Sequence, residues 1–327
     1  MPYPGVRMRR LRSNRLLREI VAETSLSPTD LIAPLFVREG ISEPQVIPSL
    51  PGVVQHSLAS LSAEAKRLAS LGVPAIVLFG IPLAKDPVGL GASNPTGIVQ
   101  VALESLAADL GDRLTLIADL CLDEYTDHGH CGLIDEHGAV DNDATLDRYC
   151  ETALAQARAG AHLVAPSGMM DGQVGAIRKA LDGDGHSGVG VLAYAAKYAS
   201  ALYGPFRDAV DVEIAGGGDR RGYQQNPANR REALREVQLD IDEGADIVMV
   251  KPALSYLDVI CEVRRRFDVP VAAYHVSGEY AMVKAAAERG WIDGQAVALE
   301  QTLAIKRAGA DMILTYFAAE LAEVLGA

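Results

Sequence analysis

Short apolar runs recur along this chain of 327 residues, and stretches of helical periodicity separate them. The runs are apolar almost throughout, which is typical of strands that are buried on both faces of a sheet. We expect eight β-strands: Leu31–Val37, Ala75–Gly80, Leu114–Leu120, Leu163–Pro166, Gly190–Ala195, Ile247–Lys251, Val271–Val276 and Met312–Phe317. Buried strands that alternate with helices predict a parallel sheet, because parallel neighbours need a crossover long enough to hold a helix.

Helical patterns fill the intervals between these runs. The clearest are Ala63–Leu71, Thr145–Ala159, Arg231–Glu243, Tyr256–Phe267 and Ala296–Ala308. Three of them lead into the next strand through a similar connection, Ala-Gly-Ala-His or Glu/Ala-Gly-Ala-Asp, whose glycines are Gly160, Gly244 and Gly309. Glycine at this place supplies the left-handed conformation that ends a helix. The repeated connection therefore predicts a repeated βα unit.

This order of elements predicts a (β/α)₈ barrel, the TIM barrel. A doubly wound open sheet is the alternative, but no strand is followed by the Gly-x-Gly-x-x-Gly pattern of a dinucleotide fold. The run Gly216-Gly217-Gly218 lacks the helix and the Lys-Ser/Thr of a phosphate loop, so we interpret it as a mobile loop. No linker divides the chain. We expect an extended N-terminal arm over residues 1–25 and a single catalytic barrel over residues 26–327.

The overall charge excludes some classes of partner. Lys and Arg number 30 against 43 Asp and Glu, a formal net charge of −13, which argues against general affinity for nucleic acid or anionic membranes. No apolar stretch approaches the ~18 residues of a membrane span. No signal peptide is visible, and the four cysteines do not form a disulfide framework, so we expect a cytoplasmic protein.

The beginning of the chain departs from this acidic balance. Six arginines precede the first acidic residue, Glu19: Arg7, Arg9, Arg10, Arg12, Arg15 and Arg18. A nucleic-acid-binding arm and an organelle transit sequence are two possible interpretations. A third is a segment that lies against an acidic neighbouring subunit, which agrees better with the net charge and predicts a homo-oligomer.

Two lysines stand in apolar surroundings, although the chain contains only seven lysines. Lys251 ends the run Ile247–Val250, and Lys197 lies within Leu192–Ala199, which contains no acidic residue. A lysine in an apolar pocket loses its proton readily and becomes a nucleophile, whereas arginine does not. Two such lysines predict carbonyl chemistry through Schiff bases. The alternative is that each lysine pairs with a carboxylate at a strand end.

Polar residues gather where the predicted strands end. They are Asp119, Ser167, Lys197, Lys251, Ser277 and Tyr316. In a (β/α)₈ barrel the catalytic groups lie at the carboxyl ends of the strands, so these residues are candidates for one active site.

The segment 244–258, which contains Lys251-Pro252-Ala253-Leu254-Ser255, closely resembles the active-site signature of the porphobilinogen synthase (5-aminolevulinate dehydratase) family. The resemblance covers nearly the whole chain and includes residues 9–12, 31–37, 119–132, 165–172, 203–207 and 274–279. It implies an enzyme, a hydro-lyase, that joins two molecules of 5-aminolevulinate into porphobilinogen and releases two waters, a step of haem biosynthesis. Lys251 would bind the first substrate as a Schiff base, and Lys197 the second.

The resemblance also implies the residues that hold the substrate. Arg207 and Arg220, with Gln224 nearby, would bind one carboxylate, and Ser277 and Tyr316 would bind the other. Asp119 and Ser167 complete the implied substrate-binding set. The segment 203–224 could form a lid that keeps water from the imines.

The loop 119–132 resembles the catalytic metal loop of the family. Zinc-dependent relatives have three cysteines at the positions of Cys121, Asp123 and Cys131, so this chain departs from the pattern at Asp123. Two thiolates and a carboxylate, with His130 adjacent, still suit Zn²⁺, although Mg²⁺ could compete for the harder ligand. A metal here would polarise a ketone or activate a water. The alternative is that the cysteines are only buried thiols.

The resemblance implies two further properties. Some bacterial relatives bind an activating Mg²⁺ at the position of Glu236, although an ion pair on the helix surface is the simpler interpretation of that residue. An octamer is common in the family. Two other functions remain open: a class I aldolase, which needs one Schiff-base lysine and a phosphate site, and a catalytically silent metal-binding or assembly protein.

Overall fold

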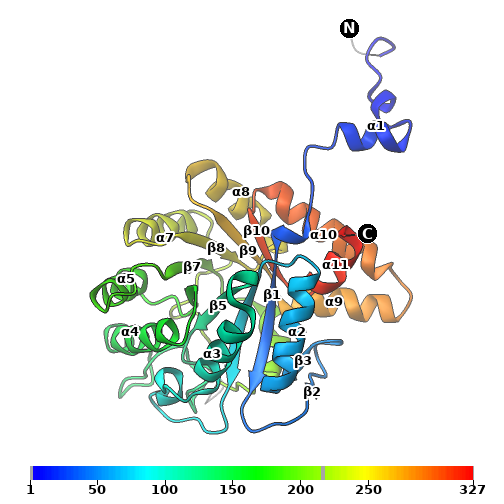
Figure 1. The fold of residues 1–327 in the computed structure, drawn as a ribbon. Helices are drawn as coiled ribbons and strands as arrows, with labels where there is room; N and C mark the ends of the chain where they lie inside the picture. The colour runs from blue at the N-terminus through cyan, green and yellow to red at the C-terminus, as the bar shows by residue number, and fades with distance from the viewer. Residues whose placement is uncertain (1–2, 215–217, 327) are drawn as a thin grey trace.

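Eight parallel strands close into a barrel in the computed structural model, which describes residues 3–214 and 218–326 (Figure 1). They are β1 (Leu31–Arg38), β4 (Ala75–Ile81), β5 (Thr115–Leu120), β6 (Leu163–Pro166), β7 (Gly190–Lys197), β8 (Ile247–Lys251), β9 (Val271–His275) and β10 (Met312–Thr315). Each strand pairs with the next along the chain, and β10 pairs with β1. The predicted (β/α)₈ barrel is confirmed, and no predicted strand end differs from the observed one by more than two residues.

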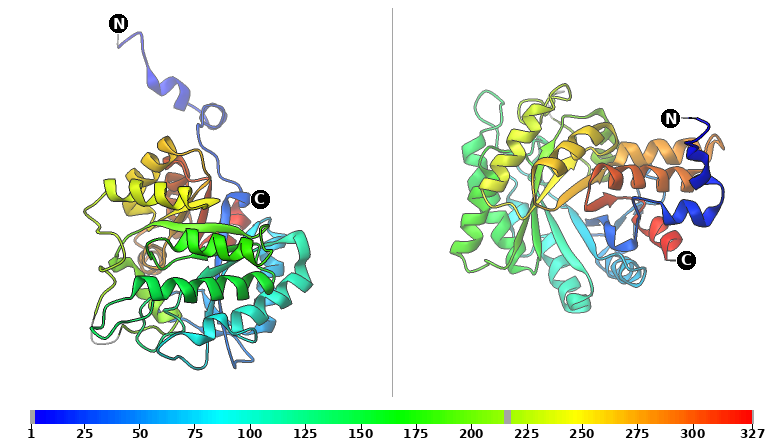
Figure 2. Two further views of the ribbon diagram at one scale, coloured as in Figure 1. Left: turned by 90° about the vertical axis from the view of Figure 1, so that its left-hand side faces the viewer. Right: turned by 90° about the horizontal axis from the view of Figure 1, so that it is seen from above.

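Helices surround the barrel and return the chain from one strand to the next (Figure 2). They are α2 (Leu58–Ser70), α3 (Ile98–Leu110), α4 (Asn142–Arg158), α5 (Gln173–Gly183), α7 (Arg231–Asp242), α8 (Leu257–Arg266), α9 (Ser277–Glu288), α10 (Gly294–Ala308) and α11 (Ala318–Leu325). Helix α2 begins five residues before the predicted start, because the Ser57 side chain caps it by accepting a hydrogen bond from Ser60 N. Within the described ranges, none of the helices could cross a bilayer, because none is long and apolar enough.

The three predicted glycine connections take left-handed backbone conformations. Gly160, Gly244 and Gly309 have φ angles of 99°, 107° and 121°, which side-chain-bearing residues rarely adopt. A Cβ added at Gly309 would lie 2.6 Å from the Arg264 side chain. Glycine is therefore needed both for the backbone turn and for the close packing of neighbouring units.

Several short elements have too few residues to show a period in the sequence. A small hairpin of β2 (Gln45–Val46) and β3 (Val54–His56) extends the sheet from β1. Helix α6 (Gly204–Ala209) follows β7. The 3₁₀ turns include Met8–Arg12, Pro28–Asp30, Leu90–Ser93, Gly111–Arg113, Ala201–Tyr203 and Leu254–Tyr256. Two glycines of the predicted mobile loop, Gly216 and Gly217, lie outside the described residues.

The N-terminal segment extends away from the barrel at the end where β1 begins (Figures 1 and 2). It contains one short helix, α1 (Arg15–Ile20), which buries no residue. Its apolar side chains include Met8, Leu16 and Ile20, which are 69%, 60% and 79% exposed. Since the strands point away from this end, the segment lies opposite the carboxyl ends where the candidate catalytic residues stand.

Candidate active site

The two lysines stand side by side on adjacent strands. Lys197 ends β7 and Lys251 ends β8, and the pairing of these strands makes the two residues direct register partners. A shift in register between Ala193 and Ala196 precedes this pairing. Each lysine is only 5% exposed. The barrel therefore brings together two buried amines that are 54 positions apart in sequence.

Aromatic rings enclose the amine of Lys251. Its Nζ lies 4.4 Å from the ring centroid of Tyr274, 5.1 Å from Tyr194, 5.2 Å from Tyr203 and 5.2 Å from Phe206. Burial lowers the pKa of Lys251 from 10.5 to about 7, and the neighbouring Lys197 contributes to this change. A large fraction of Lys251 is thus unprotonated near neutral pH and able to attack a carbonyl carbon.

The amine of Lys197 has more polar surroundings. Its Nζ donates a hydrogen bond of 2.5 Å to the main-chain carbonyl of Ser167, and the ring of Tyr194 lies 5.6 Å away. The Ser167 hydroxyl in turn donates to Asp119 Oδ2 at 3.0 Å. Burial raises the pKa of Asp119 to about 6, although both lysines oppose the change. The carboxyl ends of β5, β6 and β7 therefore supply one hydrogen-bonded group, and Lys251 of β8 lies beside it.

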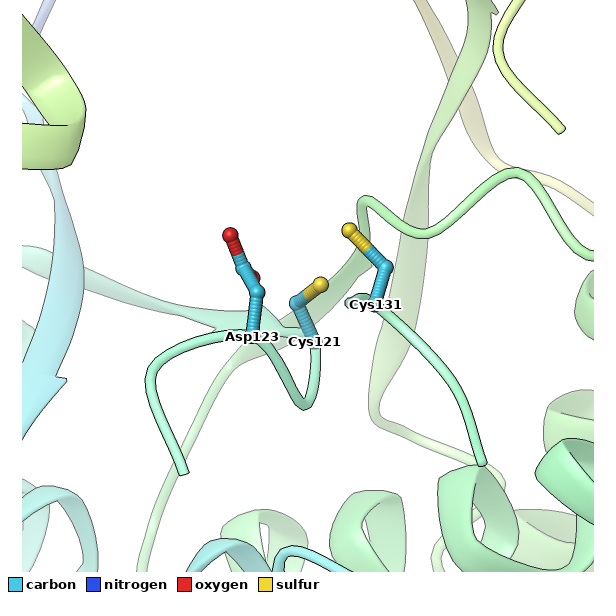
Figure 3. A group of neighbouring side chains, drawn as sticks. All are labelled: Cys121, Asp123 and Cys131. Carbon is cyan, nitrogen blue, oxygen red and sulfur yellow. The ribbon is translucent and has the colours of Figure 1, made fainter. Parts of the chain in front are cut away.

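Three potential metal ligands converge in the loop that follows β5 (Figure 3). The Sγ atoms of Cys121 and Cys131 and a carboxylate oxygen of Asp123 all lie within 4.8 Å of one another, and all three side chains are buried. His130 is not part of this cluster; its Nδ1 lies 3.2 Å from the hydroxyl of Tyr223. The sequence thus predicted three members of the cluster and one neighbour.

Arg220 forms an ion pair with the cluster. Its Nη2 lies 2.8 Å from Asp123 Oδ2 and donates a second hydrogen bond of 2.8 Å to the carbonyl of Gly129. Burial alone would raise the pKa of Asp123, but Arg220 and Lys197 outweigh it and hold the pKa well below its usual range. Asp123 is therefore an anion, and Arg220, predicted to bind a substrate carboxylate, contacts a protein carboxylate here.

The two thiols of the cluster differ. Burial raises the pKa of Cys121 well above 9, and Cys131 accentuates the shift. Burial also works against ionisation of Cys131, but the hydrogen bond from Cys121 and the charge of Arg220 lower its pKa to about 7. Asp123 is thus ionised, and Cys131 is about half ionised near neutral pH, even before any cation contributes. Two sulfur ligands and one oxygen ligand fit Zn²⁺, which in catalytic sites takes three protein ligands and keeps a fourth position open.

The other predicted substrate residues surround the lysines. The Ser277 hydroxyl accepts a hydrogen bond from Phe206 N at 3.0 Å and lies 3.3 Å from the carbonyl of Leu202. The Tyr316 hydroxyl lies 3.1 Å from that of Tyr274. Ser277 therefore ties the segment after β7 to the end of β9, beside the ring that covers Lys251.

Arg207 and Gln224 belong to the segment that covers this end of the barrel. Arg207 is on α6, is partly exposed and makes no side-chain hydrogen bond or ion pair with any described residue. Gln224 is buried, and its Nε2 has no partner among the described residues. Both amino-acid side chains thus keep donors available for a ligand.

Glu236 lies beside the site rather than in it. It is on α7 and lines a cleft of 510 Å³ together with His130, Asp171, Gln224 and Glu232. Burial raises its pKa, and Asp171 adds to the shift. Within residues 3–214 and 218–326 it forms no ion pair.

Sequence reasoning missed the aromatic enclosure of Lys251. Tyr194 and Tyr274 lie in predicted strands, and Tyr203 and Phe206 follow the Lys197 strand. Only 5% of the chain is aromatic, so tyrosines inside the two strands that flank the Lys251 strand could have been noticed. Their common orientation toward one amine depends on which residues face the barrel interior, which the sequence does not give.

Known proteins resemble this chain over nearly its full length. The family model described as "Delta-aminolevulinic acid dehydratase" matches residues 5–324. Delta-aminolevulinic acid dehydratases of Streptomyces coelicolor and Mycobacterium tuberculosis are each 57% identical, over 99% and 98% of this chain and 98% and 97% of their own.

A solved structure has the same architecture. It is the delta-aminolevulinic acid dehydratase (porphobilinogen synthase) of Toxoplasma gondii in complex with the reaction product porphobilinogen. It is 45% identical and superposes with a TM-score of 0.96 over 98% of this chain and 91% of its own. With two buried lysines at adjacent strand ends and a cysteine–aspartate cluster beside them, this chain belongs to the delta-aminolevulinic acid dehydratase family of lyases.

Proposed function

We propose that this protein is a porphobilinogen synthase, which condenses two molecules of 5-aminolevulinate into porphobilinogen and two waters. Lys251 and Lys197 would each form a Schiff base with the ketone of one substrate. The observation that carries the proposal is the register pairing of the two buried lysines, with the pKa of Lys251 lowered to about 7. A class I aldolase would need only one such lysine.

The substrate carboxylates would meet separate groups of residues. Arg207, Arg220 and Gln224 would hold one of them, because arginine can bind a carboxylate through two parallel hydrogen bonds. Ser277 and Tyr316 would hold the other at the side of the aromatic enclosure. Asp119 and Ser167 would contact the second substrate near Lys197, where their hydrogen bond already places an acceptor beside the amine.

Cys121, Asp123 and Cys131 would hold the catalytic metal, and zinc suits two sulfurs better than Mg²⁺ does. A bound zinc would supply Lewis acidity toward an oxygen atom of the substrate. His130 would lie outside the ligand set. Glu236 would provide a second, activating Mg²⁺ site in its cleft with Asp171 and Glu232, where oxygen donors predominate.

Residues 1–25 would form an assembly arm and residues 26–327 the catalytic barrel of a homo-oligomer, an octamer as is common in the family. The exposed apolar side chains and six arginines of the arm support a contact with a second, acidic copy of the chain. The four free cysteines, two of them in the metal cluster, suit a reducing cytoplasm.

Incubation with 5-aminolevulinate tests the reaction directly. We expect porphobilinogen to form, and borohydride reduction to fix a substrate adduct on the peptide that contains Lys251, as mass spectrometry would show. Product without any lysine adduct would contradict the Schiff-base mechanism. Neither product nor adduct, with the metal cluster loaded, would contradict the proposed function as a whole.

Deletion of residues 1–20 tests the arm. We expect a smaller particle by light scattering and lower activity. The circular dichroism of the barrel should be retained, because no residue of the arm's helix α1 is packed into the barrel core. High salt should have a similar but weaker effect, since salt screens exposed charge contacts. An unchanged particle size would show that the arm is not an assembly element.

A further inference from the structure

The ring of Tyr194 lies close to both amines. It is on β7, three residues before Lys197, and it is fully buried. The centroid of its ring is 5.6 Å from the Nζ of Lys197 and 5.1 Å from the Nζ of Lys251. This tyrosine is thus shared by both amines.

The hydroxyl of Tyr194 has no hydrogen-bond partner among the described residues. Asp119 Oδ1, at the end of β5, also has no hydrogen-bond partner among the described residues. Burial raises the pKa of Tyr194, and Asp119 adds to the shift both through its charge and as an acceptor that faces the hydroxyl, although the two groups do not reach hydrogen-bond geometry. The site therefore holds one unused donor and one unused acceptor beside the lysines.

Other buried tyrosines of this region use their hydroxyls. Tyr203 donates to the carbonyl of Tyr198 at 2.8 Å, and Tyr149 donates to the carbonyl of Cys131 at 2.7 Å. A buried hydroxyl without a partner destabilises a protein, and such groups are rare outside functional sites. Phenylalanine would fill the position of Tyr194 without that cost, so the hydroxyl is better explained by a ligand than by the fold.

We propose that the Tyr194 hydroxyl is a catalytic group that donates a hydrogen bond to the ketone oxygen of the substrate when Lys251 attacks it; this rests on the proposed function. The nitrogen lone pair forms the N–C bond, and the π electrons of the C=O bond move onto the oxygen. The nitrogen then passes one proton to that oxygen, which gives the neutral carbinolamine. A donor aimed at an oxygen that gains charge lowers the barrier of such a step.

The variant Tyr194→Phe keeps the ring and removes the hydroxyl. We expect the rate at which borohydride traps the Lys251 adduct, and kcat/KM with it, to fall about 100-fold, the usual effect of removing one such donor. The melting temperature should stay the same or rise, because no protein hydrogen bond is lost.

Tyr280→Phe is the matched control. Tyr280 is also buried, but its hydroxyl donates to the carbonyl of Pro51 at 2.6 Å, at the periphery of the barrel. This variant should lower the melting temperature and leave the rate of adduct formation unchanged. The two substitutions therefore have opposite expected effects on stability and on reaction rate.

Three outcomes would overturn the inference. A wild-type rate of adduct formation in Tyr194→Phe would show that the hydroxyl does not assist the attack. A fall in its melting temperature as large as that of Tyr280→Phe would show that the hydroxyl has a structural partner. Absence of both adduct and product in the wild-type protein would overturn the proposed function and this inference together, whereas the first two outcomes leave the proposed function intact.

Discussion

Lys197 and Lys251 are the same residue at paired positions of neighbouring strands, yet their surroundings differ. Rings of Tyr274, Tyr194, Tyr203 and Phe206 enclose Lys251, whereas Lys197 donates a hydrogen bond to a main-chain carbonyl beside Asp119. Lys197 also acts on the metal cluster, because its charge helps to keep Asp123 ionised.

One fold can therefore give two identical side chains separate tasks, because it gives them different surroundings. An aromatic enclosure removes water and favours the neutral amine, which is the form that attacks a carbonyl. A polar site with carboxylates and a metal cluster favours ions and suits proton transfer and polarisation of a second substrate. We therefore expect Lys251 to act as an independent nucleophile and Lys197 to depend on its polar neighbours.

Replacing each lysine by methionine is the strongest test of this comparison. Lys251→Met should lower turnover by roughly 10³-fold or more and abolish the borohydride adduct, because methionine keeps the stem but offers no nucleophile. Lys197→Met should also stop turnover but should keep an adduct on Lys251, measured by peptide mass spectrometry. The roles of the two lysines would be reversed if the Lys251→Met variant formed an adduct on Lys197 and the Lys197→Met variant formed no adduct on Lys251.

Removal of a metal ligand should have the next largest effect. It should lower the rate of turnover, which needs Lys197, but not the rate of adduct formation at Lys251. Cys131→Ala should abolish zinc retention during dialysis against a mild chelator, measured by atomic absorption, and lower turnover by about 10²-fold. Asp123→Cys should tighten retention, because thiolate is the softer ligand.

The control for the metal experiment is Cys150→Ala, on α4 and outside the cluster, which should retain zinc like the wild type. The rate of adduct formation at Lys251 should be similar in all three variants. If the Cys131→Ala enzyme stays fully active with Mg²⁺ alone, the cysteines are not ligands of an essential zinc.

The pH dependence of adduct formation tests whether the aromatic enclosure lowers the pKa of Lys251. Only the neutral amine reacts, and the pKa of Lys251 is lowered from 10.5 to about 7. The trapping rate should therefore rise about tenfold between pH 6 and pH 8 and then level off. A rate that keeps rising toward pH 10 would mean that the enclosure does not lower the pKa of the amine.

The smallest effect is expected from opening one wall of the enclosure. Phe206→Leu removes a ring that lies 5.2 Å from the Lys251 Nζ, so water can better solvate the ammonium. The midpoint of the trapping profile should move up by roughly half a pH unit. Phe267→Leu, at the end of α8 and away from the lysines, is the control that should leave the midpoint in place.

Much of the site was predictable because it lies at element boundaries. Lys251 ends a predicted strand, Asp119 lies one residue before the end of another, and Lys197 lies two residues past the end of a third. The barrel places all strand ends in one region. Their convergence followed from the fold alone. Cys121, Asp123 and Cys131 lie within eleven positions of each other, so their clustering needed only a compact loop. Their spacing, together with the family resemblance, was enough to predict them as metal ligands.

Contacts between distant segments were not predictable in this way. Arg220, which is proposed to bind a substrate carboxylate, is also paired with Asp123, 97 positions earlier in the chain, and no pattern in the sequence indicates this contact. His130 is adjacent to Cys131 in sequence, yet its ring contacts Tyr223 instead of the cluster. Both cases depend on how the segment after β7 folds back over the strand ends, for which no periodic pattern exists.

The sequence by itself determined the eight strands, most of the helices around them, the glycine connections and the residue types available for chemistry. These features are local: each depends on periodicity or on the backbone freedom of single residues. The tertiary structure alone decided which amine is enclosed by rings, which carboxylate has a cationic partner, and which tyrosine keeps a free hydroxyl. Desolvation and charge pairing depend on every neighbour within a few ångströms, and in a closed barrel those neighbours come from strands far apart in sequence.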